Sequence, residues 1–251
     1  MQKVFFRLRS FIVFLIHCQH KPESLFYASL RDKIDHAFTH DARLFLKRNK
    51  TIIQFSDPGA VKKHRSRTVA AIYKHSTSTK RNSRLIFNLV RYIKPKIVFE
   101  LGTSLGVNTI YLAKPYPVKV ISFEGAAPIL SIAKEVHNRY FPQGYVEYIA
   151  GNIHETLPPT LKRQQPDMIF MDAEHTFAAT ITFFELCKIH ARVNSRLVIV
   201  LDDIYWSPGM KLAWENIKRA PEVSGTIDLY TLGIVFFDPQ LLSEHHKWFI
   251  I

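Results

Sequence analysis

The sequence predicts an α/β fold built on a mostly parallel sheet with helices on both faces. From residue 96 onward, short apolar or β-branched runs alternate with stretches of helical periodicity, a pattern typical of parallel sheets. Most of the first five runs are almost continuously apolar, as strands covered on both faces should be. The last two runs are joined only by Thr231–Gly233, which predicts an antiparallel pair at the end of the sheet.

Seven strands and five helices are expected in this part of the chain. The strand-like runs are 96–101, 118–123, 145–149, 167–171, 196–201, 226–230 and 234–237. The helical patterns are 107–113, 127–140, 153–161, 176–191 and 209–219. A chain of 251 residues with 47% apolar content can bury one large core and carry a small appendage.

The N-terminal part has a different composition. Residues 1–96 contain 21 lysines and arginines against 5 acids, whereas the remainder contains 13 against 16. Helical patterns occur at 23–38, 41–47, 67–74 and 79–92, around a Pro-Gly turn and a basic loop within 54–65. We therefore expect a helical, basic extension. Such a surface suits an acidic substrate, nucleic acid or anionic lipid, although an ordinary solvated face explains it as well.

The first residues predict an amphipathic helix over 3–18. Three basic residues precede an apolar run, as in a signal peptide, but no small-x-small cleavage site follows and the run is too short to span a membrane. Docking on the protein's own core or in a homodimer is favoured over weak membrane-surface contact. Cys18 and Cys187 show neither disulfide nor metal spacing, which favours a reducing, cytoplasmic setting.

Polar residues follow each of the first five predicted strands. The sequence places Glu100 with the turn Gly102–Gly106, then Glu124–Gly125, Gly151–Asn152, Asp172–His175 and Asp202–Asp203. Ligands of open α/β sheets bind beyond the carboxyl ends of the strands. These residues are therefore the candidates for a functional site at one rim.

The turn Gly102-Thr103-Ser104-Leu105-Gly106 also matches the Gly-x-Ser-x-Gly elbow of serine hydrolases. Ser104 would be the nucleophile, with Asp202 or Asp203 and His245 or His246 completing the order of an α/β-hydrolase. That fold needs several strands before the elbow, where this chain shows helical patterns, and the elbow leaves Glu100 and Glu124 without a role. This alternative is less favoured but stays open.

A nucleotide-like cofactor explains more of the same residues. Gly102 and Gly106 allow close approach of the backbone at the start of a helix. Glu124 follows about twenty residues later, where a carboxylate can accept hydrogen bonds from ribose hydroxyls. Glu100 would repel a pyrophosphate but attract an amino group and a sulfonium cation.

On these residues the sequence resembles the class I S-adenosylmethionine-dependent methyltransferases over roughly 84–237. Phe99–Gly106 resembles their first motif, Ser122–Glu124 their ribose-binding acid and Gly151–Asn152 their adenine-side turn. The stretches 167–175 and 200–209 resemble the small O-methyltransferases related to catechol O-methyltransferase. The resemblance implies a Rossmann-like, seven-stranded sheet with an antiparallel last strand. It also implies a substrate cap over residues 1–83 and a methyltransferase domain over 84–251.

The resemblance further implies the function and the residues that carry it. The expected reaction transfers a methyl group from S-adenosylmethionine to an oxygen, or less readily a nitrogen, of a small molecule. The residues expected to bind the cofactor are Glu100, Gly102, Thr103, Ser104, Gly106, Glu124, Gly125, Asn152 and Asp172. His175 occupies the position of the family's catalytic lysine, and we expect it to act as a general base near neutral pH beside Asp172.

A magnesium site is a further expectation carried by the resemblance. The family's metal-dependent members use an aspartate after strand four and an Asp-Asn pair after strand five. The matching residues are Asp172, Asp202 and Asp203, so an aspartate replaces the asparagine. Three carboxylates suit Mg²⁺ or another hard divalent cation, but relatives without metal also carry acids here. A non-catalytic module that binds a polyanion, with a vestigial cofactor site, is the remaining alternative.

Overall fold

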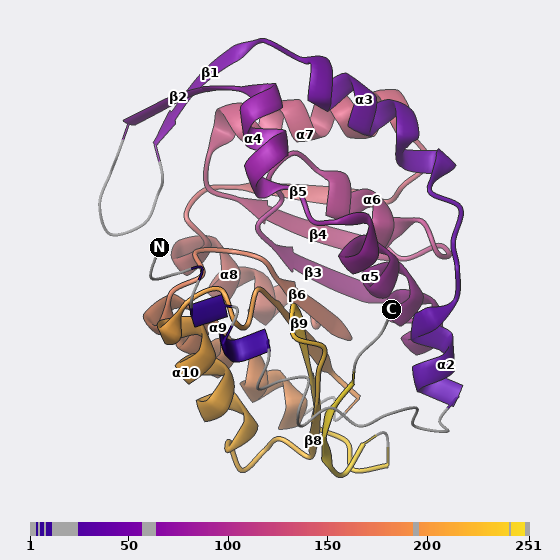
Figure 1. Cartoon of the computed structure of the whole chain (residues 1–251), viewed down its shortest axis with the longest axis vertical. Helices are drawn as coiled ribbons and strands as arrows, with labels where there is room; N and C mark the ends of the chain where they lie inside the picture. Colours follow the sequence, from indigo (N-terminus) through magenta and orange to yellow (C-terminus); the bar gives the residue numbers. More distant parts are fainter. Residues whose placement is uncertain are drawn as a thin grey trace. The chain divides into compact units, whose positions relative to one another are not determined.

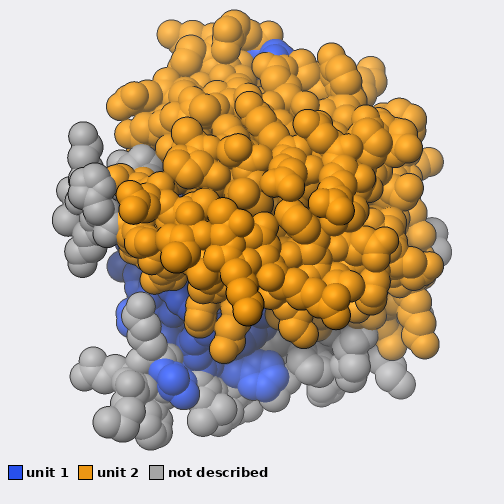
Figure 2. Space-filling model, turned by 90° about the horizontal axis from the view of Figure 1, so that it is seen from above, with its two compact units in different colours: residues 1–28, 164–251 blue, residues 29–163 orange. Residues whose placement is uncertain are grey.

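The computed structural model describes residues 4, 6, 7, 9–11, 25–56, 64–192, 196–240 and 242–248 (Figure 1). The chain forms two compact units, residues 29–163 and residues 1–28 with 164–251, which Figure 2 distinguishes by colour. The division falls within α2 (Leu25–Arg31). The boundary predicted between a substrate cap (1–83) and a methyltransferase domain (84–251) concerns function rather than compactness, and it stays a prediction.

The 29–163 unit contains three parallel strands with helices between them. β3 (Ile97–Leu101) pairs with β4 (Lys119–Glu124), which pairs with β5 (Val146–Ala150). The connecting helices are α6 (Val107–Ala113) and α7 (Ala127–Tyr140), and α8 (Ile153–Arg163) follows β5. The side chains of β3 are buried from Val98 onward, as the apolar pattern predicted. The parallel order brings the carboxyl ends of the three strands to one edge of this part of the sheet.

The N-terminal part of the same unit combines short helices with a hairpin. Its elements are η1 (Ala37–Thr39), α3 (His40–Arg48), β1 (Ile52–Ser56), β2 (His64–Thr68), α4 (Val69–Ser76) and α5 (Lys80–Ile93). Thr68 and Thr79 cap α4 and α5 by accepting the backbone N–H groups of Ala71 and Asn82. The predicted helices at 41–47, 67–74 and 79–92 are thus confirmed to within a few residues.

The Pro-Gly turn predicted within 54–65 lies outside the described residues, and the described ends of this stretch form strands that were not predicted. β1 and β2 pair as antiparallel strands, with Ser56 opposite His64, while residues 57–63 lie outside the described part of the chain. Ile52 and Ile53 begin a β-branched run, but the following Gln54 and the charged residues of β2 hide the strand pattern. The region is therefore a mixture of helices and a hairpin.

The second unit contains the remaining strands. β6 (Met168–Met171) and β7 (Val198–Asp202) are parallel, and β9 (Leu232–Phe236) lies antiparallel between β7 and β8 (Gly225–Asp228). α9 (Phe177–Lys188), η2 (Ile189–Arg192) and α10 (Pro208–Lys218) accompany them. The predicted antiparallel last pair is confirmed. One further short strand, β10 (His245–Lys247), pairs in parallel with β8 and was not predicted.

Helix boundaries in this unit follow from local chemistry. Ser207 caps α10 by accepting the N–H of Met210, and Pro208 occupies the first turn. Thr176 does the same for α9 through the N–H of Ala179. No helix among the described residues is long and apolar enough to cross a membrane. The described residues among 4–11 are helical, whereas 12–24 lie outside the described part.

Candidate active site

The loop between β3 and α6 has the backbone conformation that its glycines predicted. Gly102, Ser104 and Gly106 have φ values of 102°, 48° and 77°, all in the left-handed region. The N–H groups of Gly102 and Thr103 both donate to the carbonyl of Phe123 at 3.0 Å, which fixes the loop against the end of β4. A Cβ at Gly106 would lie 3.2 Å from the Cβ of Ala133 on α7, so the loop also needs a glycine for close packing.

Glu100 lies behind this loop and is fully buried. Its Oε2 accepts hydrogen bonds of 2.5 Å from the hydroxyls of Thr109 and Ser122. The hydroxyls of Ser122 and Thr103 are 2.5 Å apart, which links the carboxylate to the loop. Sequence analysis missed the part played by Thr109, because only the fold brings this α6 residue to the end of β3. The network fixes a carboxylate directly under the glycine loop.

Glu124 holds the outer side of the same loop. Its Oε2 accepts the backbone N–H of Ser104 and its Oε1 accepts that of Ala126, each at 2.9 Å. Glu124 and the adjacent Gly125 are only partly buried, so this carboxylate remains accessible where Glu100 does not. Both acids expected to bind the cofactor therefore converge on one turn.

The turn after β5 joins the same edge of the sheet. Gly151 has a φ of 126° and donates its N–H to the carbonyl of Glu124 at 2.9 Å. Asn152 starts α8: its carbonyl accepts the N–H groups of Glu155 and Thr156, and its Oδ1 accepts that of His154 at 3.0 Å. The structure thus gives Asn152 a capping role. Its expected contact with an adenine stays a prediction.

The second unit brings the acidic residues after β6 and β7 together with His175. The Nε2 of His175 lies 3.3 Å from Oδ1 of Asp172, and the two side chains are 27% and 17% exposed. Glu174, His175 and Asp203 have φ values of 59°, 36° and 55°, a strained backbone typical of functional turns. The N–H of Asp203 is held by the carbonyl of Thr231 at 2.7 Å and by Oδ1 of Asp202 at 2.9 Å.

The charged groups of this cluster shift one another's pKa values. Burial lowers the pKa of His175, but its hydrogen bond to Asp172 and the charges of Asp172, Asp203 and Asp202 outweigh burial and raise the pKa to about 9. Burial raises the pKa of Asp202, as do its neighbours Asp172 and Asp203, against the opposing charge of His175. Burial likewise raises the pKa of Asp203. These interactions favour the protonated form of His175 at neutral pH.

The three acids expected to hold a metal ion are not gathered into a recognisable ligand group. Within the described ranges, no three His, Cys, Asp or Glu side chains form a group able to hold a metal ion. Asp172 is engaged by His175 at 3.3 Å. The assignment of a cation to Asp172, Asp202 and Asp203 remains a prediction of the resemblance, and we derive no step through a metal.

Aromatic residues line the segment that follows Asp203, and most of their contacts were not predictable from the sequence. Tyr205 stacks on Tyr230 with ring centroids 5.1 Å apart, and its hydroxyl donates to Asp228 at 2.7 Å. The guanidinium of Arg7 lies 4.8 Å from the ring centre of Trp206. Arg7, one of the described residues of the predicted N-terminal helix, therefore contacts its own unit.

The hydrolase arrangement is not supported. Among the described residues, the hydroxyl of Ser104 makes no hydrogen bond to a histidine, and its backbone N–H is committed to Glu124. His245 contacts the hydroxyl of Thr226 at 2.9 Å, and His246 stacks on Trp248. Both histidines therefore have structural contacts in and around β10.

Comparison with known proteins agrees with the cofactor interpretation. Residues 99–204, somewhat less than half of the chain, match the family model described as "Methyltransferase domain". This range begins one residue before Glu100 and ends one residue after Asp203. A search of curated proteins finds no match to the chain.

Solved structures of methyltransferases share the fold. An O-methyltransferase from Bacillus cereus in complex with SAH is 19% identical, with a TM-score of 0.54 over 64% of this chain and 83% of its own. A cofactor-bound protein from MTB is 16% identical, with a TM-score of 0.62 over 87% and 99%. The O-methyltransferase TomG from Streptomyces achromogenes, in complex with SAM, is 17% identical, with a TM-score of 0.58 over 85% and 94%.

The predicted Rossmann-like fold is thus confirmed. The family match extends over both the glycine loop with its two glutamates and the acidic turns that follow β6 and β7. Residues 99–204 are thus similar to a methyltransferase domain, and the chain shares the fold of methyltransferase structures that bind SAM or SAH.

Proposed function

We propose that the protein transfers a methyl group from S-adenosylmethionine to an oxygen, or less readily a nitrogen, of a small molecule. The observation that carries this proposal is the convergence of Glu100 and Glu124 on the turn 102–106. A carboxylate under the loop suits a ligand with an ammonium group and a sulfonium centre, and a partly exposed one suits ribose hydroxyls. The methyltransferase structures with bound SAM or SAH share this fold.

The residues of the glycine loop fit this cofactor. Gly102, Thr103, Ser104 and Gly106 would surround its methionine part near Glu100. Glu124 and Gly125 would hold the ribose, and Asn152 would lie on the adenine side, with Asp172 as a further contact. When bound, S-adenosylmethionine supplies an electrophilic methyl group on a sulfonium. The left-handed turn allows the backbone to approach such a ligand closely.

His175 and Asp172 are the proposed catalytic residues. The acceptor hydroxyl must lose its proton as its oxygen forms the new bond to carbon and the carbon–sulfur bond breaks. His175 receives this proton once it is itself neutral, and Asp172 orients the ring through their 3.3 Å contact. Because the raised pKa keeps His175 charged at neutral pH, only a small fraction of the protein is ready to act as a base there. The rest of the site aligns the acceptor and excludes water.

A direct experiment is to incubate the protein with S-adenosylmethionine and a metabolite mixture and to search by mass for a compound that gains one methyl group. Catechols, phenols and primary amines, tested one by one, then distinguish oxygen from nitrogen acceptors. Methylation in the intact protein that is lost in E124A supports the proposal. Binding of S-adenosylhomocysteine without turnover of any acceptor would contradict catalysis while leaving the cofactor site intact.

Three finer predictions accompany this function. A cytoplasmic location, a homodimer formed through residues 3–18, and weak membrane-surface contact of that helix all remain predictions. Sedimentation of the purified protein with and without anionic vesicles tests the last two. The docking of Arg7 on Trp206 supports an internal role for the helix.

A further inference from the structure

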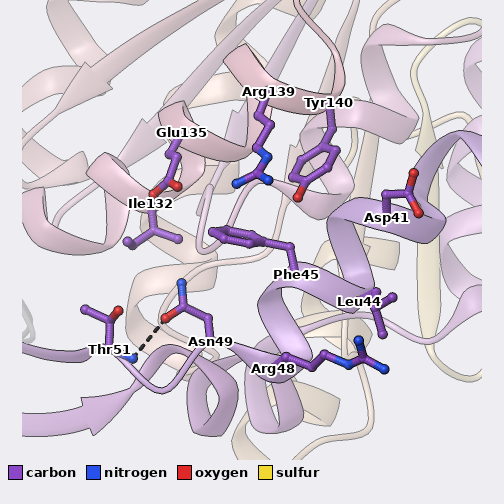
Figure 3. Close-up of a pocket in the computed structure, with 10 residues that line it drawn as sticks. All are labelled: Asp41, Leu44, Phe45, Arg48, Asn49, Thr51, Ile132, Glu135, Arg139 and Tyr140. Atoms are coloured by element: carbon purple, nitrogen blue, oxygen red, sulfur yellow. Dashed lines mark hydrogen bonds between the residues drawn. The ribbon is translucent and has the colours of Figure 1, made fainter.

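A pocket of 790 Å³ lies between α3 and α7 in the 29–163 unit (Figure 3). It shares no residue with the candidate active site, and its volume lies within the range of roughly 300–1,000 Å³ that ligand pockets occupy. Its lining consists of Asp41, Leu44, Phe45, Arg48, Asn49, Thr51, Ile132, Glu135, Arg139 and Tyr140. The methyl-transfer proposal gives these residues no task.

Helical spacing explains why these side chains face one groove. Leu44 and Arg48 are four residues apart on α3, and Glu135 and Arg139 are four apart on α7. Residues at this spacing lie on the same face of a helix. Figure 3 shows Arg139 and Tyr140 projecting from α7 toward Phe45, which comes from α3.

Three planar side chains of the pocket lie close together. The guanidinium of Arg139 lies 5.3 Å from the ring centre of Phe45 and 5.4 Å from that of Tyr140. The two rings are 5.9 Å apart and tilted by 48°. Arginine and aromatic planes of this kind are the platforms on which nucleic-acid bases stack.

The two arginines of the pocket are available to bind a ligand. Across the described residues, neither Arg48 nor Arg139 forms an ion pair, although Asp41 and Glu135 also line the pocket. Guanidinium groups bind phosphate through paired hydrogen bonds. The two carboxylates are exposed, and as acceptors they suit amino or hydroxyl groups of a ligand more than a second anion.

We propose that the α3–α7 pocket binds a nucleotide, with the base stacked against Arg139, Phe45 and Tyr140 and the phosphate held by Arg48 and Arg139. The nucleotide is either free or one unit of a single-stranded RNA, since both present the same base and phosphate. This site is independent of methyl transfer, because it uses other residues.

Calorimetric titration of the full chain with AMP tests the proposal, with excess S-adenosylhomocysteine present to occupy any adenine site at the glycine loop. Adenosine and inorganic phosphate, titrated separately, test the base and the phosphate alone. A twelve-residue oligoadenylate RNA distinguishes the two sources of the nucleotide. Each variant is compared with the intact protein by circular dichroism and thermal melting, so that loss of folding is not mistaken for loss of binding.

R48Q and R139Q are expected to weaken AMP binding at least fivefold each, whereas K47Q and K134Q should stay within twofold. These controls remove an exposed lysine from the same two helices outside the pocket. F45L tests stacking and should weaken AMP and adenosine alike. RNA binding at least tenfold tighter than AMP assigns the site to a strand, and equal affinity assigns it to a free nucleotide. Absence of binding at millimolar AMP and RNA, or equal losses in the lysine controls, would overturn the proposal.

Discussion

The carboxylate of Glu124 accepts the backbone N–H of Ser104 at 2.9 Å, and this contact joins the end of β4 to the loop that follows β3. Glu124 is thereby placed without the help of any ligand, because a second bond from Ala126 fixes its other oxygen. A preorganised acceptor of this kind binds a ligand without first having to be ordered.

Replacing Glu124 tests this arrangement. E124Q substitutes an amide donor for one of the two oxygens that accept N–H groups, so the loop loses a bond and the ribose an acceptor. We expect S-adenosylhomocysteine to bind at least tenfold more weakly, as measured by calorimetry. E147Q serves as control, since Glu147 is an exposed residue of β5 that pairs with Lys119. Equal affinities of E124Q and the intact protein would be inconsistent with this assignment.

Gly106 should tolerate no side chain. G106A combines a φ of 77° with a Cβ 3.2 Å from that of Ala133, and we expect it to lower the free energy of unfolding by about 1–3 kcal/mol. G209A is the matched control, because the nearest neighbour of its new Cβ lies at 3.6 Å and Gly209 sits in the first turn of α10. Urea denaturation of both variants gives the comparison. A G106A protein as stable as G209A would show that the loop is not as constrained as described.

Ser104 should not act as a nucleophile. In S104A the backbone N–H that donates to Glu124 remains, so affinity for S-adenosylhomocysteine should change by less than about threefold. A fluorophosphonate probe should leave the intact, folded protein unlabelled. Covalent labelling at Ser104, detected by mass spectrometry, would contradict this prediction and support the hydrolase alternative.

Methyl transfer should depend on pH through His175. Since charges nearby raise its pKa to about 9, the neutral fraction falls about tenfold for each pH unit below that value. We therefore expect kcat/KM to rise from pH 6 and to level off near pH 9. D172N removes the largest favourable partner of the charged ring and should shift the rise to lower pH. H175Q should lose roughly 10²- to 10⁴-fold in rate and the pH dependence with it; a profile unchanged in H175Q would refute the assignment.

His137 should make stability depend on acid conditions. Burial lowers its pKa, while backbone contacts with Gly144 and Phe141 oppose the shift. The unfolded chain then binds the proton more readily than the folded one. The protein is therefore most stable, with respect to His137, above about pH 6.5, and its free energy of unfolding falls as the pH drops below that value. H137Q should flatten this slope, whereas H154Q, at an exposed residue, should not. Denaturation series between pH 5 and pH 8 provide the slopes.

Local patterns predicted most of the fold, and the exceptions have physical reasons. The apolar strands and the capped helices, such as α10 with Ser207 and Pro208, carry their signals in adjacent residues. β10 contains His245, His246 and Lys247, whose polar side chains give no strand signal, and only pairing with β8 makes it a strand. The β1–β2 hairpin is similarly hidden by its charged second strand.

The sequence singles out candidate residues for the site but says nothing of their interactions. Glu100, Glu124 and Asp172 follow strands, and position alone singles them out. By contrast, the bond from Thr109 to Glu100 and the raised pKa of His175 depend on distances between side chains that no spacing in the sequence reveals. The raised pKa of His175 bears on the pH at which this residue could accept a proton.

The most direct test of the account is titration of the purified protein with S-adenosylhomocysteine, followed by calorimetry and by thermal unfolding. The account predicts measurable heat, and a rise in melting temperature that grows with ligand concentration, because a ligand at one hundred times its Kd stabilises the folded state by about 2.7 kcal/mol. Neither heat nor stabilisation at millimolar ligand, in protein shown to be folded, would contradict the claim that Glu100, Glu124 and the glycine loop form a cofactor site.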